Sequence, residues 1–186
     1  MKIALYGGTF DPIHHGHLIL ARTALEQLAF DRVVFVPAAL SPHKLASKPA
    51  PAEIRIEMVR AAIEDEPGFA VDESEARQTG PSFAIETVES WRRREPEAEM
   101  FYLIGEDNVA ELPTWRQCEE LRRRAQFVVF GRGAGDAVHS FPVVDRRFDI
   151  SATELRERVA RGHSIRYLVP ESVRALIETH GLYRGN

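Results

Sequence analysis

The chain has 186 residues, a length that suits one domain with a substantial core. Hydrophobic residues make up 44% and charged residues 28%, which excludes a disordered chain, a collagen-like repeat and a coiled coil. The formal net charge of -4 argues against a general nucleic-acid binder. No apolar run reaches the roughly 18 residues of a membrane span, and the lone Cys118 allows no internal disulfide. We expect one cytoplasmic domain over residues 1–186.

Apolar periodicity divides the chain into alternating strands and helices. In chain order we expect a strand at 2–6, a helix around 18–28, a strand at 32–37, a loop at 38–51, a helix at 52–64, a strand at 69–71, a helix at 81–94, a strand at 100–104, a helix at 119–125, a strand at 127–130, a weaker strand at 141–144, and helices at 151–161 and 173–180. Pro81 suits a first helical turn, and Gly162 suits a helix end. This alternation predicts a doubly wound α/β sheet with its ligand outside the carboxyl ends of the strands.

The segment GGTFDPIHHGH, residues 7–17, follows the first expected strand. It lacks the Gly-Lys-Ser/Thr ending of a phosphate-binding P-loop and the glycine spacing of a dinucleotide fingerprint. Gly7 and Gly8 would let the backbone approach a ligand closely. A helix that begins near Gly16 would present free N–H groups to a phosphate. His14 and His17 are three residues apart and can face the same point at that helix start.

The two histidines allow three interpretations. Their imidazoles can donate hydrogen bonds to phosphate oxygens, they can simply cap the helix, or they can bind zinc. Zinc would need further ligands, for which His43 and His163 are the available histidine candidates. The residues alone favour phosphate and leave the other two interpretations open.

Segment 7–17 closely resembles the signature of nucleotidyltransferases with a His-x-Gly-His motif. Within that superfamily, the chain is similar to the bacterial nicotinate-nucleotide adenylyltransferases over residues 1–183. Further matching motifs are SPHK at 41–44, GED at 105–107 with Trp115 downstream, ISATELR at 150–156 and SIRYLVP at 164–170. The resemblance implies a Rossmann-like doubly wound parallel sheet of nucleotidyltransferase type, with C-terminal helices.

The resemblance also implies a reaction and a set of site residues. An adenylyl group passes from ATP to nicotinate mononucleotide, giving deamido-NAD and pyrophosphate in NAD biosynthesis, with Mg²⁺ on the ATP oxygens. The implied catalytic residues are His14, His17, Lys44 and Arg156. The implied ATP-binding residues are Gly7, Gly8, Thr9, Phe10, Gly105, Asp107, Ile150, Ser151 and Thr153. The implied acceptor-binding residues are Ser82, Phe83, Ala84, Trp115 and Arg132.

Several of these residues have a plainer alternative. Segment 151–154 has the pattern of a helix-capping box, and Asp107 is suited to be a helix N-cap. Lys44 and Arg132 read as solvated surface cations, and Trp115 as a core residue. Lys44 is still notable, because only 3 of the 24 basic residues are lysines, a bias that genomic base composition explains.

The acceptor site departs from the family pattern. Relatives commonly carry Ser-Tyr-Thr where this chain has Ser82, Phe83 and Ala84, so two hydroxyls are lost. Backbone N–H groups at the start of a helix near Ser82 suit a carboxylate better than a carboxamide. Nicotinamide mononucleotide, phosphopantetheine, the use of CTP and a non-catalytic nucleotide-binding module remain alternatives. The histidine pair, Lys44 and Arg156 argue against the last, and a homodimer is compatible with the family.

Overall fold

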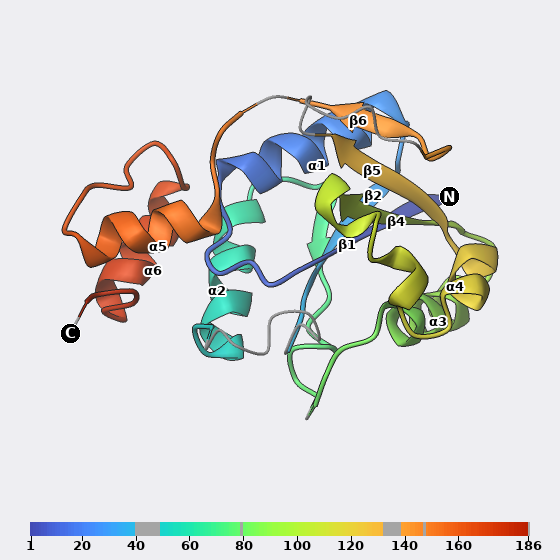
Figure 1. Cartoon of the computed structure of the whole chain (residues 1–186), viewed down its shortest axis with the longest axis horizontal. Helices are drawn as coiled ribbons and strands as arrows, with labels where there is room; N and C mark the ends of the chain where they lie inside the picture. The colour runs from blue at the N-terminus through green and yellow to red at the C-terminus, as the bar shows by residue number, and fades with distance from the viewer. Residues whose placement is uncertain (40–48, 79, 132–138, 147, 186) are drawn as a thin grey trace.

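Six parallel strands form one continuous sheet at the centre of the molecule (Figure 1). The structure is a computed structural model that describes residues 1–39, 49–78, 80–131, 139–146 and 148–185. The strands are β1 (Lys2–Gly8), β2 (Arg32–Pro37), β3 (Phe69–Val71), β4 (Glu99–Gly105), β5 (Gln126–Gly131) and β6 (Val143–Asp145). Their order across the sheet is β3-β2-β1-β4-β5-β6, and every neighbouring pair is parallel. This order confirms the predicted doubly wound α/β fold.

The strand sequences explain why the sheet is buried on both sides. Runs such as Val33–Val36 and Leu103–Ile104 are apolar at consecutive positions, so side chains that point to opposite faces both enter a core. The strand order reverses between β1 and β4, which lie side by side and lead into opposite halves of the sheet. In such sheets the crevice at this reversal binds the ligand.

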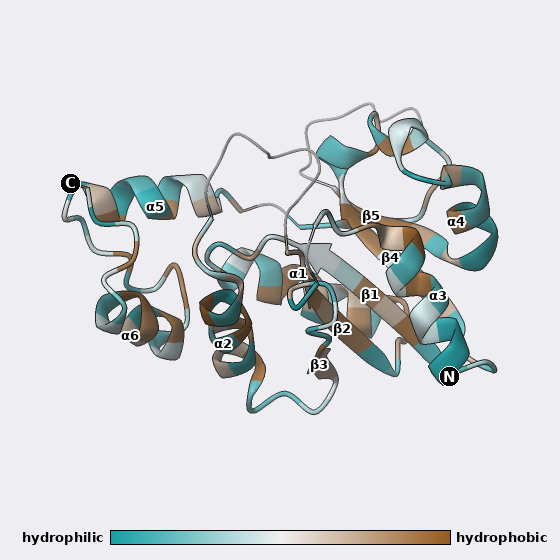
Figure 2. Cartoon of the chain, turned by 90° about the horizontal axis from the view of Figure 1, so that it is seen from below, coloured by the Kyte–Doolittle hydropathy of each residue, from teal (hydrophilic) through white to brown (hydrophobic). Residues whose placement is uncertain are grey.

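Helices cover the two faces of the sheet and enclose two separate cores. They are α1 (His15–Gln27), α2 (Ala52–Ile63), α3 (Ala84–Arg94), α4 (Cys118–Arg124), α5 (Ala152–Ala160) and α6 (Glu171–Thr179). Residues of α1, α2, α5 and α6 share one apolar cluster with the sheet, and residues of α3 and α4 share the other. Figure 2 shows the apolar residues concentrated along the strands and polar residues on the helices around them.

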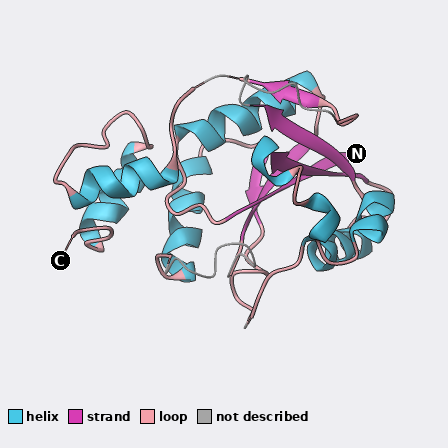
Figure 3. Cartoon of the chain, viewed as in Figure 1, coloured by secondary structure: helices cyan, strands magenta, loops and turns pink. Residues whose placement is uncertain are grey.

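The helices α5 and α6 extend the molecule beyond α2, at the end opposite α3 and α4 (Figure 3). Leu155, Val173 and Ile177 join them to the core on the α1 and α2 face. Gly162 ends the α5 turn with a φ of +72°, as its position in the sequence predicts. No helix in the described part of the chain is long and apolar enough to cross a membrane.

Two element boundaries and two short turns stand out as differences from the sequence predictions. The helix expected from residue 81 begins at Ala84 with Phe83 as its N-cap, so Pro81 lies outside its first turn. The weak strand expected at 141–144 is β6, shifted to Val143–Asp145. Two 3-10 turns, Glu106–Asn108 and Leu112–Thr114, follow β4 and were not expected. Such short turns leave almost no periodic signal in a sequence.

Candidate active site

The end of β1 packs so tightly that its glycines are required by neighbouring side chains. A Cβ on Gly7 would overlap the hydroxyl of Tyr102 on β4. A Cβ on Gly8 would lie 2.8 Å from the ring of Phe10. The sequence suggested that these glycines make room for a ligand; the structure shows that they first make room for two aromatic rings. Gly7, Gly8 and Thr9 nevertheless line an open pocket described below.

His14 and His17 lie against each other at the start of α1. Their ring centroids are 3.7 Å apart and the planes are 24° from parallel. The backbone N–H of His14 donates to Nδ1 of His17 over 3.3 Å. Because Nδ1 accepts that bond, a neutral His17 carries its proton on Nε2, where it can donate to a ligand. The histidines therefore cap the helix, as one interpretation proposed, and still offer a donor to phosphate.

The ring of Phe10 packs against the imidazole of His17. The two rings stand edge-on with centroids 5.1 Å apart, and only 2% of Phe10 is exposed. A nucleotide could therefore reach only the backbone of Phe10. Gly16 is equally constrained, because a Cβ there would lie 2.9 Å from the His14 ring and 2.9 Å from Phe148. The motif is packed as a rigid unit around the histidine pair.

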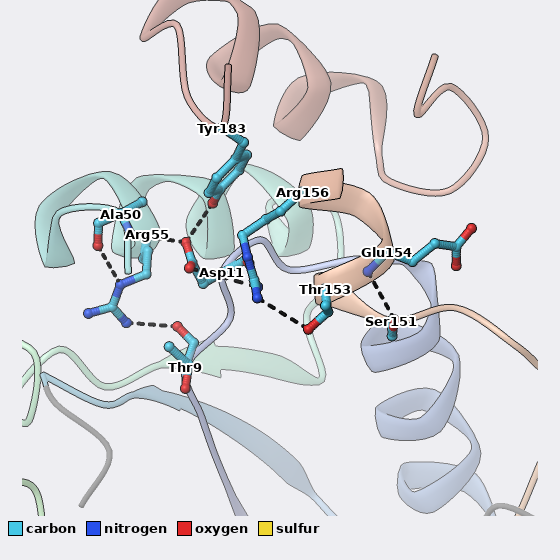
Figure 4. Close-up of polar contacts among 9 residues, drawn as sticks. All are labelled: Thr9, Asp11, Ala50, Arg55, Ser151, Thr153, Glu154, Arg156 and Tyr183. Carbon is cyan, nitrogen blue, oxygen red and sulfur yellow. Dashed lines mark hydrogen bonds and ion pairs between the residues drawn. The ribbon is translucent and has the colours of Figure 1, made fainter. Parts of the chain in front are cut away.

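Asp11 joins the motif to the C-terminal part of the chain (Figure 4). Its buried carboxylate accepts from the hydroxyl of Tyr183 at 2.6 Å and from the N–H of Ala50 at 3.1 Å. The guanidinium of Arg156 donates to the carbonyl of Asp11 at 2.8 Å and to the hydroxyl of Thr153 at 3.2 Å. Sequence reasoning gave no role to Asp11 or Tyr183. The structure shows that they place the start of α5 beside the histidine motif.

The start of α5 has the predicted cap. The hydroxyl of Ser151 accepts from the N–H of Glu154 at 3.1 Å, so this side chain is engaged in capping the helix. Thr153 is exposed, and Ile150 and Arg156 are half-buried. Both α1 and α5 thus begin within reach of Asp11, and each presents backbone N–H groups and a partial positive charge at that end.

We expect Tyr183→Phe to lower the free energy of unfolding by about 1.5–3 kcal/mol, the range for hydrogen bonds to charged groups. Burial and the bond to Asp11 raise the pKa of Tyr183, so its hydroxyl stays protonated and donates at neutral pH. Urea denaturation measures the loss. Tyr167→Phe is the matched control, because Tyr167 is 82% exposed and should leave the unfolding midpoint unchanged. Equal midpoints for the Tyr183 variant and the wild type would contradict the role of Asp11 as an anchor.

A buried arginine that the sequence did not reveal holds the loops around the site. Arg55 on α2 is 1% exposed and donates to four backbone carbonyls. They belong to Thr9 at 2.7 Å, Ala38 at 2.8 Å, Ala39 at 3.2 Å and Ala50 at 2.9 Å. Figure 4 shows the bonds to Thr9 and Ala50. Burial lowers the pKa of Arg55, and the nearby Asp11 opposes that effect. The guanidinium joins the end of β1, the end of β2 and the approach to α2.

A pocket of about 240 Å³ opens beside the end of β1. It brings together seven predicted residues, namely Gly7, Gly8, Thr9, Ser82, Phe83, Ala84 and Trp115. It also contains residues that sequence reasoning missed, which are Ala38, Glu75, Tyr102, Ile104, Asn108, Thr114 and Arg116. Tyr102 and Ile104 are missed because a buried strand residue looks like core until its neighbours are known.

Aromatic and charged groups shape the wall of this pocket. Trp115 stands edge-on to Tyr102 with ring centroids 6.0 Å apart. The guanidinium of Arg116 lies 4.6 Å from the ring centre of Phe83, and it pairs with Glu86 at 3.1 Å. Ser82 uses its hydroxyl oxygen to accept from the N–H of Ala39 at 3.1 Å. Ser82 therefore connects the pocket to the loop that follows β2.

The remaining predicted residues lie elsewhere or outside the described residues. Gly105 ends β4, and Asp107 is exposed in the 3-10 turn that follows. The suggestion that Asp107 is an N-cap is wrong, because Gly105 holds that position. Lys44 and Arg132 lie outside the described residues.

The zinc interpretation finds no support in the described residues. Among residues 1–39, 49–78, 80–131, 139–146 and 148–185, no three His, Cys, Asp or Glu side chains are grouped to hold a metal ion. His163 is exposed and follows the C-terminal end of α5, whereas Ser151 caps its N-terminal end. His43 lies outside the described ranges.

The cytidylyltransferase-like family model matches residues 5–158. Two similar proteins carry the name "Probable nicotinate-nucleotide adenylyltransferase". The one from Exiguobacterium sibiricum is 44% identical, and the alignment covers 98% of this chain and 99% of that protein. The one from Thermus thermophilus is 43% identical over 99% of this chain and 100% of that protein.

The fold also resembles solved structures. The nicotinic acid mononucleotide adenylyltransferase of Plasmodium falciparum, complexed with NaAD, aligns with a TM-score of 0.77 at 17% identity. The alignment covers 100% of this chain and 98% of that one. The crystal structure of a protein from Vibrio parahaemolyticus named "Putative Nicotinate-nucleotide Adenylyltransferase" aligns with a TM-score of 0.70 at 23% identity and the same coverage. At these identities the likeness establishes the shared fold.

Proposed function

The chain belongs to the cytidylyltransferase-like family and, within it, to the nicotinate-nucleotide adenylyltransferases, and from this premise we propose how its residues carry out the reaction. The enzyme transfers an adenylyl group from ATP to nicotinate mononucleotide, giving deamido-NAD and pyrophosphate in NAD biosynthesis. One observation carries the assignment of roles. The segment that leads from β1 to the histidine pair at the start of α1 also supplies Gly7, Gly8 and Thr9 to the wall of the aromatic pocket. The two halves of a dinucleotide product would meet along this wall.

The ATP phosphates would bind between the starts of α1 and α5. The Nε2–H of His17, the adjacent His14 and the guanidinium of Arg156 supply donors there, and both helix starts supply partial positive charge. Lys44 and Arg132 are proposed as further phosphate contacts, on the triphosphate and the acceptor phosphate respectively. Gly105, Asp107 and Ile150 are proposed to contact the nucleoside.

The chemistry needs no nucleophilic side chain and no general base. The phosphate of the acceptor is already anionic, and one of its oxygens attacks the α-phosphorus of ATP in line. A new bond forms between that oxygen and the α-phosphorus as the bond to the bridging oxygen of the pyrophosphate breaks. Catalysis then consists of positioning the two phosphates and stabilising charge on the leaving group. Mg²⁺ would enter with ATP and would neutralise part of the triphosphate charge, while His14, His17 and Arg156 stabilise the rest.

The acceptor base would occupy the aromatic pocket. Trp115 offers a face to the pyridine ring, and the first N–H groups of α3, at Ala84 and Ile85, suit a carboxylate. The hydroxyl oxygen of Ser82 accepts a hydrogen bond from Ala39, so backbone N–H groups would contribute most to distinguishing a carboxylate from a carboxamide. The absence of hydroxyl groups at Phe83 and Ala84 should then weaken the preference for a carboxylate only slightly.

We expect pyrophosphate release from ATP to be fastest with nicotinate mononucleotide. Across a panel of acceptors, nicotinamide mononucleotide should have a kcat/KM lower by at least about tenfold, because a carboxamide is uncharged and presents an NH₂ donor where a carboxylate presents a second acceptor oxygen. Phosphopantetheine, and CTP in place of ATP, should give only background release. A preference for nicotinamide mononucleotide would contradict the acceptor assignment. No release with any acceptor would favour a regulatory module instead.

A further inference from the structure

The acceptor pocket contains a buried carboxyl group to which the proposed reaction gives no role. Glu75 is 5% exposed and lines the pocket together with Ser82, Tyr102 and Trp115. We propose that Glu75 is a specificity-determining residue, which distinguishes an acid from an amide on the acceptor ring through its own protonation state. The inference rests on the proposed function, because it places the pyridine ring in this pocket.

Two hydroxyls orient the Glu75 carboxyl. Thr87, which is 4% exposed on α3, donates a short hydrogen bond to its Oε1. Ser82 also makes a side-chain hydrogen bond with Glu75. Because the Ser82 oxygen accepts from the N–H of Ala39, its own proton is available for the carboxyl. A carboxyl has about four lone-pair positions, so these bonds leave capacity for a proton or a ligand hydrogen bond.

The groups around Glu75 make its charge sensitive to what binds. Burial raises its pKa, the bonds from Thr87 and Ser82 oppose that rise, and the carboxylates of Asp72 and Glu86 reinforce it. Burial also acts to raise the pKa of Asp72, but hydrogen bonds from its neighbours hold that pKa below its usual value. The donors are Ser74, Trp91 at 2.6 Å and Arg94 at 2.9 Å.

The other ionisable neighbours do not offset this negative field. The hydroxyl of Tyr102 stays neutral, because burial raises its pKa well above the usual value. Arg116 lines the same pocket but pairs with Glu86. A bound nicotinate would therefore add a negative charge beside a carboxyl whose pKa Asp72 and Glu86 already raise.

The two acceptors then favour opposite states of Glu75. A nicotinate carboxylate favours the protonated form, which can donate a hydrogen bond and carries no repelling charge. A nicotinamide NH₂ group favours the ionised form, which accepts. As pH rises through the raised pKa of Glu75, the ratio of kcat/KM for nicotinate to that for nicotinamide mononucleotide should fall. One titrating group changes this ratio by at most about tenfold per pH unit.

The test measures this ratio between about pH 5.5 and pH 9, a range that begins above the usual glutamate pKa. The ratio cancels titration of the triphosphate and of the acceptor phosphate, which both reactions share. The wild-type ratio should fall with pH, and Glu75→Gln should make it constant, because an amide can donate or accept at any pH. Glu73→Gln is the matched control, since Glu73 pairs with Arg60 and Arg77 and does not line the pocket, and it should keep the wild-type slope.

Thr87→Val provides a second test if Glu75→Gln fails to fold. It removes a donor that stabilises the ionised carboxyl and nearly preserves side-chain volume, so the fall in the ratio should move to higher pH. A ratio independent of pH in the wild type, the wild-type slope in Glu75→Gln, or an unmoved transition in Thr87→Val would each overturn the inference. Absence of turnover with both mononucleotides would instead contradict the proposed function.

Discussion

Replacing His17 by alanine should lower kcat about a hundred- to a thousandfold, the usual effect of removing one preorganised donor to transition-state charge. The Nδ1 of His17 accepts from the backbone of His14, so a neutral imidazole carries its proton on Nε2. The ring of Phe10 packs edge-on against the same imidazole. The imidazole is therefore fixed before substrate arrives, and its loss should appear in kcat more than in KM.

The same substitution should leave the protein folded. It removes one capping interaction, which costs about 1 kcal/mol, and His17 is only half-buried. His15→Ala is the matched control: His15 is the first residue of α1, it keeps its backbone bond to Leu168, and it lies outside the histidine pair. Its kcat should match the wild type. A folded His17→Ala enzyme with wild-type turnover would remove His17 from the mechanism.

Replacing Arg55 by methionine should lower the free energy of unfolding by about 3–5 kcal/mol, the range for breaking a buried charged network. Methionine nearly fills the space of the side chain but leaves the carbonyls of Thr9, Ala38, Ala39 and Ala50 without this donor. Water cannot easily replace it, because Arg55 is 1% exposed. Urea denaturation measures the change.

Arg60→Met on the same helix is the control. The Arg60 side chain is 60% exposed and pairs with Glu73 at the surface, so its loss should cost less than about 1 kcal/mol. Near-equal unfolding midpoints for the two variants would show that Arg55 is not the anchor of these loops. If Arg55 does anchor them, its variant should also lose kcat, because both flanks of segment 40–48, which contains Lys44, are attached to its guanidinium.

The order of strands and helices follows closely from the sequence, because it depends on local patterns. The apolar run at 32–37 is β2, and the periodic segment at 52–64 is α2 to within one residue. Ser151 caps α5 as its position before an apolar helical pattern predicts. The shifted start of α3 shows where local patterns fail. Pro81 favours a first turn, but Phe83 at the N-cap, packed under Arg116, starts the helix three residues later.

The candidate site likewise combines features that the local sequence indicates with features that it does not. The histidine motif was predicted from residue types and spacing, because a strand end, glycines and a helix start are contiguous in the chain. The pocket residues Ser82, Phe83, Ala84 and Trp115 were given only by the resemblance to the family. Arg55 and Tyr183 were not predicted, because each acts on residues far away in the sequence. Glu75 was not predicted, because nothing in the sequence shows that this glutamate is buried. Tyr183 reaches Asp11 across 172 positions, and Arg55 reaches Thr9 across 46.

The sequence by itself determined the alternating architecture, the histidine pair at a helix start and the family. The architecture and the helix start follow from local periodicity and spacing, and the family follows from a resemblance carried by several motifs in order along the chain. Only the tertiary structure decided that Asp11 contacts Arg156 of α5, that Arg55 joins the ends of β1 and β2 to the start of α2, and that Glu75 is buried in the wall of the aromatic pocket. Burial and partner depend on which distant segments meet, and it is burial that turns an ordinary arginine or glutamate into a group whose charge and hydrogen bonds matter.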